Sequence, residues 1–270
     1  MLKKRLLTAL WGVPLVIVAV WFDEPIPWFT ALAAVAGFVA ALEFYHMVGV
    51  SRIIPLAVCG LILTLIFIVY PHFNVNLDLS LVSLILTAAV VLPMLLMLFV
   101  PKREGIFRHW AWTLTGVLYI GWLISCLVAL RLEAGRDWVF LVLFATFGSD
   151  TAAYFIGKAI GRHKMAPAIS PGKTWEGAVA GVLGAAVIGY LFTLDTPLRL
   201  PLDYAHAIIL GVVISIFGQL GDLAESMLKR GTGVKDSGII MPGHGGILDR
   251  LDSILFAGVI VYLFYNFFIT

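Results

Sequence analysis

Apolar segments long enough to cross a lipid bilayer recur along nearly the whole chain. A membrane helix needs about 20 mainly apolar residues, and nine segments approach that length: roughly 6–22, 27–48, 53–70, 79–100, 110–130, 138–158, 175–194, 204–228 and 248–268. The alternation of apolar and polar residues that marks a membrane β-strand is missing, so these segments are expected to be helices. The predicted fold class is an all-α, polytopic integral membrane protein with about nine transmembrane helices.

The composition excludes a water-soluble domain. Of the 270 residues, 61% are hydrophobic and only 13% are charged, whereas soluble domains carry about 25% charged residues. Cys59 and Cys126, the two cysteines, both lie inside apolar segments. They are expected to be small buried residues and not a disulfide or metal ligands.

The basic residues predict an orientation. When the nine segments alternate in direction, 15 of the 18 lysines and arginines fall on one side, and Arg131, Arg136 and Arg199 fall on the other. Cytoplasmic loops are enriched in Lys and Arg, so the N-terminus is expected in the cytoplasm. The first segment lacks a small-residue cleavage site and is expected to be retained as a helix. We expect a multi-pass protein of the cell (inner or plasma) membrane.

The unusual residues lie in the second half. Residues 1–135 resemble ordinary lipid-facing helices, whereas 136–270 are expected to carry the catalytic site, the two parts forming one membrane unit. The longest polar connections are only 159–174 and 229–247. Matched interrupted helices in two halves, which an inverted-repeat transporter would show, are not seen.

Carboxylates within the membrane segments are the main functional candidates, because a charged group is costly there. Asp222 and Glu225, like Asp249 and Asp252, are three residues apart and so share a helix face. With Asp150, these acids are expected at one depth on three helices. A divalent cation or neighbouring bases must compensate them, and an all-oxygen ligand set suits Mg²⁺. The alternative, that the acids only pair with bases to close helix ends, stays open.

Two connections have the composition of phosphate-binding loops. Ser170-Pro-Gly-Lys173-Thr174 leads into a helix, whose N-terminus attracts anions, although Pro167 stands where a Walker A loop needs glycine. An ordinary turn with cytoplasmic lysines is the alternative. Residues 229–250 contain six glycines, four bases and His244, so their backbone can approach a polyphosphate closely.

The segment from Ser226 to Asp252 resembles the signature of the CDP-diacylglycerol synthases, or phosphatidate cytidylyltransferases. The matching positions, together with Asp150 and the upstream Ser170-Pro-x-Lys173-Thr174-x-Glu176-Gly177, cover the C-terminal half closely; they are Ser226, Lys229, Arg230, Lys235, Asp236, Gly238, Pro242, His244, Gly245, Gly246, Asp249, Arg250 and Asp252. Met241 departs from the usual Leu, Ile or Phe. The resemblance implies that CTP and phosphatidate give CDP-diacylglycerol and pyrophosphate, with Mg²⁺ and, as a candidate second ion, K⁺.

Such a reaction needs neutralised charge more than an activated nucleophile, since a phosphate is already nucleophilic. We therefore expect Asp222, Asp249 and Asp252 as metal ligands and Lys229, Arg230, Lys235 and Lys173 on the triphosphate. Further contacts to substrate are expected from Ser170, Ser226, Asp236, His244, Gly245, Gly246 and Arg250, with Asp150, Glu176 and Glu225 in support. The expected partners are CTP, phosphatidate and the bilayer, without nucleic acid, and a homodimer is one candidate assembly.

Two other functions fit part of the pattern. A CTP-dependent polyprenol or dolichol kinase would also act at a membrane, but it would release CDP, and the signature from Lys229 to Asp252 argues against it. A cation-coupled transporter would use intramembrane acids. Its acids would be strung across the bilayer, whereas here they gather toward one side.

Overall fold

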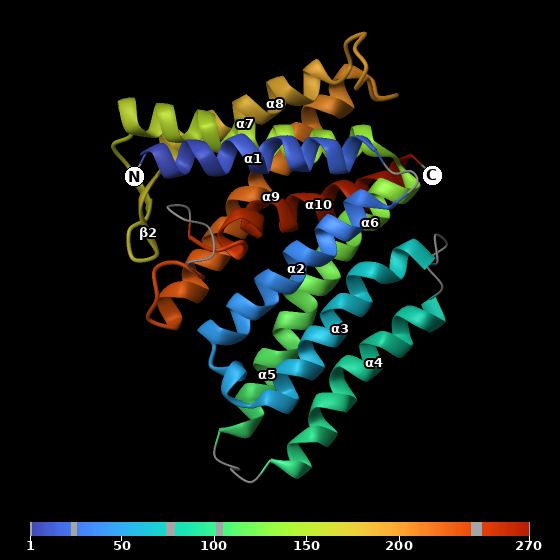
Figure 1. The fold of residues 1–270 in the computed structure, drawn as a ribbon. Coiled ribbons are helices and arrows are strands. Elements are labelled where there is room, and N and C mark those ends of the chain that lie inside the picture. The colour runs from blue at the N-terminus through green and yellow to red at the C-terminus, as the bar shows by residue number, and fades with distance from the viewer. Residues whose placement is uncertain (1, 23–25, 74–78, 101–104, 239–244, 270) are drawn as a thin grey trace. The chain divides into compact units, whose positions relative to one another are not determined.

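The structure, a computed structural model, describes residues 2–22, 26–73, 79–100, 105–238 and 245–269. For residues 2–9 and 79 it describes the backbone alone. Most elements drawn in Figure 1 are helices, and the chain divides into two compact units. The first comprises residues 1–133 and 236–249, and the second comprises 134–235 and 250–270. The described residues in this part of the signature, 236–238 and 245–249, thus group with the N-terminal helices.

Helices make up almost all of the described structure, as the hydropathy predicts. The first unit contains α1 (Leu2–Trp21), α2 (Trp28–Met47), α3 (Ile54–Phe73), α4 (Leu79–Leu96), α5 (Ile106–Gly116) and α6 (Leu123–Glu133), with short 3₁₀ turns at Val50–Arg52 and Met97–Phe99 and a π-helical turn at Val117–Trp122 that joins α5 to α6. The second unit contains α7 (Arg136–Ile160), β1 (Lys164–Ala166), β2 (Ser170–Thr174), α8 (Trp175–Leu191) and α9 (Tyr204–Gly231); α10 (Leu248–Phe268) begins at the edge of the first unit and continues in the second.

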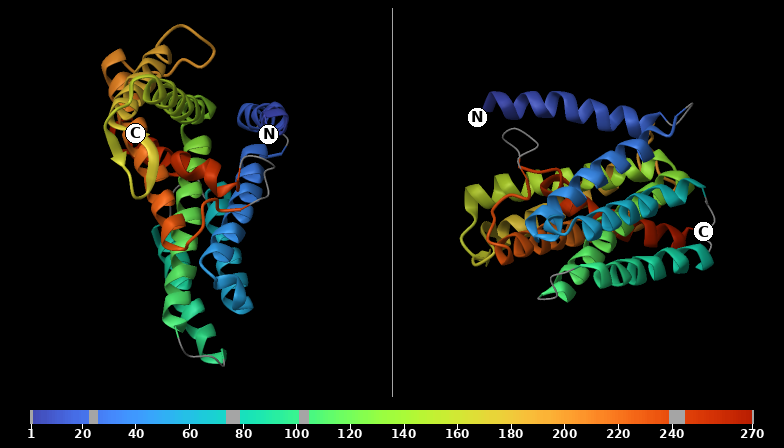
Figure 2. Two further views of the ribbon diagram at one scale, coloured as in Figure 1. Left: turned by 90° about the vertical axis from the view of Figure 1, so that its left-hand side faces the viewer. Right: turned by 60° about the horizontal axis from the view of Figure 1, so that its bottom comes forward.

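Seven helical segments in the described part of the chain are long and apolar enough to cross a membrane. The polytopic all-α class is therefore confirmed, whereas the count of nine stays a prediction. The two remaining apolar helices are shorter: Leu10–Trp21 within α1, and α8 with 17 residues. Figure 2 (left) shows α1 nearly end-on while α2 runs along the page, so α1 crosses its neighbour at a steep angle.

Two glycines, which have no side chain, leave space for a large aromatic ring in the core of the first unit. A Cβ on Gly60 of α3 or on Gly116 of α5 would collide with the ring of Tyr45, which comes from α2. The ring is fully buried, and its hydroxyl donates a hydrogen bond to the carbonyl of Thr113 at 3.0 Å. Small residues bring membrane helices close together in this way, and here they join α2, α3 and α5.

A single buried acid, Glu43 of α2, holds the segment that leads into α10. Its carboxylate accepts hydrogen bonds from the backbone N–H groups of Ile247 (3.1 Å) and Leu248 (3.0 Å) and from the Ser237 hydroxyl (3.2 Å). The first N–H groups of a helix have no partner within it, so Glu43 caps α10 from a different helix. A carboxylate at this position also suits the helix dipole.

Glycines also set the spacing of α7, α8 and α9 in the second unit. A Cβ on Gly177 or Gly181 of α8 would meet backbone atoms of α7, and one on Gly189 would meet the backbone of α9 at Ala207. In α9 itself, a Cβ on Gly211 would collide with the carbonyl of Ala185 in α8. Between the helices, the buried hydroxyls of Ser149 and Ser215 share a hydrogen bond of 2.6 Å. The three helices therefore pack at backbone distance, and α8 returns the chain from the end of α7 to the start of α9.

The expected 159–174 loop contains an antiparallel hairpin, which the sequence reading missed. Lys164 pairs with Thr174 and Ala166 with Ser170, with an irregularity between the two pairs. Strands of three and five residues are too short for a periodic signal, and Pro171 inside β2 argues against a strand unless it lies at an edge, as it does here. Thr174 ends β2 and caps α8, because its hydroxyl accepts a hydrogen bond from the Gly177 N–H.

We predict that Glu43→Ala lowers the free energy of unfolding by about 3 kcal/mol, because it leaves buried donors without an acceptor. Glu43→Gln should cost less, since one oxygen still accepts. Thermal unfolding in detergent measures the effect, with Asp195→Ala as the control, because that side chain is 98% exposed. Equal melting temperatures for Glu43→Ala and the control would show that the cap contributes nothing.

Candidate active site

A polar cavity of about 590 Å³ lies in the second unit where α7, the hairpin, α8 and α9 meet. Asp150 and Asp222 line it together with three lysines, Lys158, Lys164 and Lys173. Ser170, Gly172, Thr174 and Gly177 add hydroxyl groups and backbone that a ligand can approach closely. The sequence predicted Asp150, Asp222, Lys173 and Ser170 as site residues, and the fold brings these four to one cavity.

Asp222 is the most firmly held acid of this cavity. One oxygen, Oδ2, forms an ion pair with Nζ of Lys173 at 2.7 Å. The other, Oδ1, accepts a hydrogen bond of 3.2 Å from the hydroxyl of Ser226, one helical turn later. The side chains of Lys173 and Asp222 are 24% and 32% exposed, so the pair is only partly screened by solvent. This pairing links the end of β2 to α9 across the cavity.

Two more carboxylates of the second unit lie within electrostatic range of Asp222. Both Asp150 of α7 and Asp252 of α10 repel it, and Lys173 and Arg250 partly compensate Asp150. The close approach of α9 and α10 has a local cause: a Cβ on Gly221 would collide with the Asp252 carbonyl. Asp252 also accepts a hydrogen bond from the Ser253 N–H at 2.6 Å. The predicted gathering of acids from three helices is thus present for Asp150, Asp222 and Asp252.

The remaining charged residues at this end of α9 form specific contacts. Lys229 pairs with Glu225 one turn earlier at 2.5 Å, and the Glu225 side chain is fully buried. The Arg230 Nε donates a hydrogen bond to the carbonyl of Ile169 at 3.2 Å, so it ties α9 to the tip of the hairpin. These contacts match the alternative in which basic side chains only pair locally and close helix ends. The side chains of Lys229 and Arg230 nevertheless have further N–H donors that a ligand could use.

Glu176 holds the start of the hairpin. Its carboxylate accepts hydrogen bonds from the His163 backbone N–H, at 3.2 Å to each oxygen, and contacts the His163 ring at 2.6 Å. Because Glu176 opens α8, these contacts fix the hairpin against the helix that follows it. The supporting position expected for Glu176 therefore has a definite structural partner.

Asp249 belongs to the first unit, where it organises the glycine-rich segment. Its carboxylate accepts hydrogen bonds from the N–H groups of Gly246 (2.7 Å) and Ser237 (3.1 Å). Gly245 adopts a left-handed backbone, with φ of +81°, and a side chain there would collide with Asp249. Asp236 lies beside Gly245. His244 falls outside the described residues, and Lys235 and Arg250 belong to the second unit.

The donor set of the second unit fits a hard divalent cation. Asp150, Asp222 and Asp252 offer only oxygen atoms, and their mutual repulsion is the kind that a cation relieves. In the described residues, however, no three His, Cys, Asp or Glu side chains converge closely enough to form a finished metal centre. Asp222 is engaged by Lys173 instead.

Sequence reasoning overlooked three residues, of which two line the candidate cavity and one, Glu43, supports the fold of the first unit. Lys158 and Lys164 line the cavity, whereas in the sequence they indicate only the orientation of the chain. Glu43 was overlooked because it lies in an apolar helix about two hundred residues away from its partners. The usable signal was the cost of a carboxylate inside a membrane helix, which applies to Glu43 as it does to Asp150.

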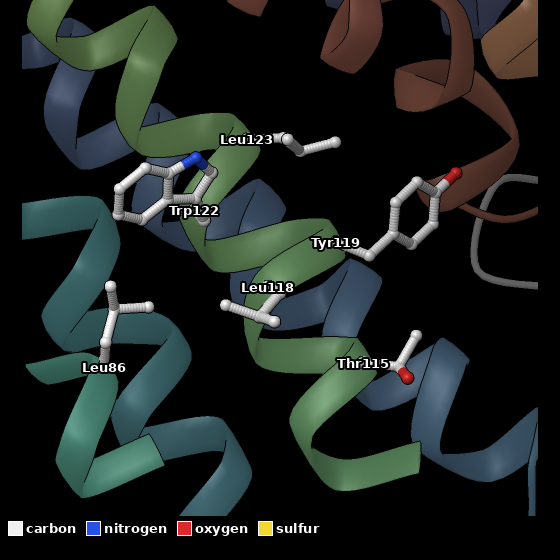
Figure 3. A pocket seen from close by; sticks show the side chains of 6 residues that line it. All are labelled: Leu86, Thr115, Leu118, Tyr119, Trp122 and Leu123. Carbon is white, nitrogen blue, oxygen red and sulfur yellow. The ribbon is translucent and has the colours of Figure 1, made fainter. Parts of the chain in front are cut away.

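A second hollow, of about 490 Å³, is apolar and lies on the first unit along the π-helical turn. Figure 3 shows Leu118 and Trp122 on the side of the helix nearer to Leu86 of α4, whereas Tyr119 and Leu123 point the other way. Its lining has no ionisable cluster that could handle phosphate. The polar cavity of the second unit is therefore the better candidate for chemistry.

Comparison with known proteins agrees with the geometry. The phosphatidate cytidylyltransferase of Bacillus subtilis is 35% identical over 239 residues, which covers 87% of both chains. The protein of the same name from Brucella suis is 43% identical over 57% of this chain and 56% of its own. The chloroplastic phosphatidate cytidylyltransferase 5 of Arabidopsis thaliana is 36% identical over 87% of this chain and 65% of its own. A model of the cytidylyltransferase family matches residues 3–268, and the chain therefore belongs to that family.

Proposed function

We propose that this protein is a phosphatidate cytidylyltransferase, which converts CTP and phosphatidate into CDP-diacylglycerol and pyrophosphate. The observation that carries the proposal is the cavity in which Asp150 and Asp222 face Lys158, Lys164 and Lys173. A cavity lined by acids and lysines suits a metal-bound polyphosphate, since the acids can hold the cation while the lysines neutralise the phosphates. Family membership and the names of the relatives point to the same substrates.

The proposed reaction is an in-line displacement at the α-phosphorus of CTP. A phosphate oxygen of phosphatidate forms the new bond to this phosphorus, and the bond to the oxygen that bridges the α- and β-phosphorus atoms breaks. Pyrophosphate then leaves with the electron pair. No protein base is needed, because the attacking phosphate is already ionised near neutral pH. The chain's contribution is to align the two phosphates and to neutralise their charge.

The contacts of the second unit support specific roles. Lys173 is held beside the acids by Asp222, and with Lys158 and Lys164 it would contact the triphosphate and the departing pyrophosphate. Ser226 orients Asp222, and Glu225 orients Lys229. Asp222 and Asp252 would hold Mg²⁺, which would stabilise the charge that develops on the phosphate oxygens. Asp249 keeps its proposed place among the ligands because of its position in the sequence signature, and K⁺ as a second ion rests on the resemblance alone.

The direct test incubates the purified protein in detergent with labelled CTP, phosphatidate and Mg²⁺. We expect pyrophosphate and CDP-diacylglycerol in equal amounts. No product should form when EDTA replaces Mg²⁺, or when diacylglycerol replaces phosphatidate. Release of CDP with transfer of a single phosphate would identify a lipid kinase. The absence of CTP turnover with phosphatidate would contradict the proposal.

We predict that Asp222→Asn lowers kcat at least about a hundredfold, because an amide of nearly equal volume removes the charge that balances Lys173 and the cation. Ser226→Ala should lower it only a few-fold, since it removes one orienting hydrogen bond. Asp195→Asn serves as the control, because this exposed acid lies at the opposite end of α8. Melting temperatures are measured in parallel. A destabilised Asp222→Asn protein with normal turnover per folded molecule would assign Asp222 to closing a helix end.

The proposed orientation places the hairpin in the cytoplasm and the α8–α9 connection outside. Single cysteines at exposed positions test this: Ala168→Cys in the hairpin and Thr196→Cys in the connection, each with Cys59 and Cys126 replaced by alanine. In intact cells, an impermeant maleimide should label only Thr196→Cys. Both should react after the cells are opened. Labelling of Ala168→Cys from outside would reverse the orientation.

A further inference from the structure

A basic cavity in the first unit has no part in the reaction proposed above. It has a volume of about 830 Å³. It lies between the end of α2, the start of α3, the end of the 3₁₀ turn that follows α4, and the start of α5. The four ends lie together toward the lower edge of the first unit in Figure 1. By length and composition, α2, α3, α4 with its turn, and α5 with α6 can all cross the membrane. We therefore infer that their shared end lies where the membrane meets water.

Four basic side chains line this cavity: Arg52, Arg108, His46 and His109. None of the described residues that line it is acidic. The guanidinium groups of Arg52 and Arg108 form no hydrogen bond or ion pair within the described part of the chain. Furthermore, Nδ1 of His109 is buried without a hydrogen-bond partner among the described residues. Buried polar atoms such as this nitrogen normally have a partner. The two arginine side chains are exposed, so the cavity offers a ligand two cationic groups that no described residue pairs.

Apolar side chains surround the basic ones. Ile54 and Phe99, which also line the cavity, are 70% and 82% exposed. Exposure of this kind at a membrane boundary is typical of residues that face acyl chains. Basic groups beside an exposed apolar rim match both parts of an anionic phospholipid, whose phosphate pairs with arginines and whose chains remain in the bilayer.

We propose that this cavity binds the headgroup of an anionic phospholipid, with Arg52 and Arg108 on its phosphate. The site shares no lining residue with the Asp222 cavity, which lies wholly in the second unit. A bound lipid would satisfy the two guanidinium groups and bridge the α2–α3 connection to α5. It would therefore stabilise the first unit as well as mark the boundary of the bilayer.

The test measures lipid retention by native mass spectrometry of the detergent-purified protein, titrated with phosphatidylglycerol or phosphatidylcholine. We expect wild-type protein to retain phosphatidylglycerol preferentially. Replacing both arginines, Arg52→Gln with Arg108→Gln, should weaken this binding about thirtyfold, given the attraction that each basic residue adds at an anionic surface. The charge-preserving pair Arg52→Lys with Arg108→Lys should stay within a few-fold of wild type, because each lysine keeps the attraction of a positive charge for an anionic surface.

The matched control is Arg136→Gln with Arg199→Gln, which removes two arginines from the second unit and should leave lipid binding unchanged. Equal retention of the two lipids, or undiminished binding by the glutamine pair, would overturn the proposal. Displacement of phosphatidylglycerol by millimolar inorganic phosphate would show a site for free anions and would overturn the lipid assignment. Melting temperatures with and without phosphatidylglycerol identify any variant that has simply lost its fold, and in that case the lysine pair decides the outcome.

Discussion

A lipid bilayer offers no hydrogen-bond partners to the backbone, and this constraint governs the architecture. Each crossing segment must satisfy its own N–H and C=O groups, which only helices and closed barrels can do. Polar chemistry is therefore displaced toward the helix ends and the connections. In the described part of the second unit, the hairpin between α7 and α8 brings backbone and hydroxyl groups to the candidate cavity. Its contacts with the start of α8, through Thr174 and Glu176, fix its position.

The carboxylates show how the chain offsets the cost of charge near lipid. Asp222 pairs with Lys173 and accepts from Ser226, Glu225 pairs with Lys229, and Glu43 and Asp249 accept backbone N–H groups. The acidic residues therefore have different structural roles. Glu43 and Asp249 organise backbone, whereas Asp150 and Asp222 line a cavity with lysines around them. Glu43 and Asp222 can be separated experimentally, because we expect loss of Glu43 to lower stability and loss of Asp222 to lower turnover.

Close helix packing gives the candidate site its rigidity. Gly177, Gly181 and Gly211 let α8 approach α7 and α9 at backbone distance, and Gly221 does the same between α9 and α10. A site that aligns two phosphates needs such support, because small displacements of the reacting groups are costly to the rate. The glycines of the hairpin and of 236–249 have a different use, since Gly172 and Gly245 shape backbone near polar groups.

The sequence alone determined the helical class, the approximate positions of seven segments long and apolar enough to cross a membrane, and Asp150, Ser170, Lys173 and Asp222 as candidate site residues. These follow from properties that are local in the chain, namely hydropathy over about 20 residues and the cost of each intramembrane charge. Tertiary structure decided which residues meet across the chain. It placed 236–249 with the N-terminal helices through Glu43, formed a hairpin whose strands are too short for a periodic signal, and gathered Arg52 and Arg108 from different helices around one cavity. Such contacts depend on how helices pack, and packing is set by side-chain shape at positions far apart in the sequence.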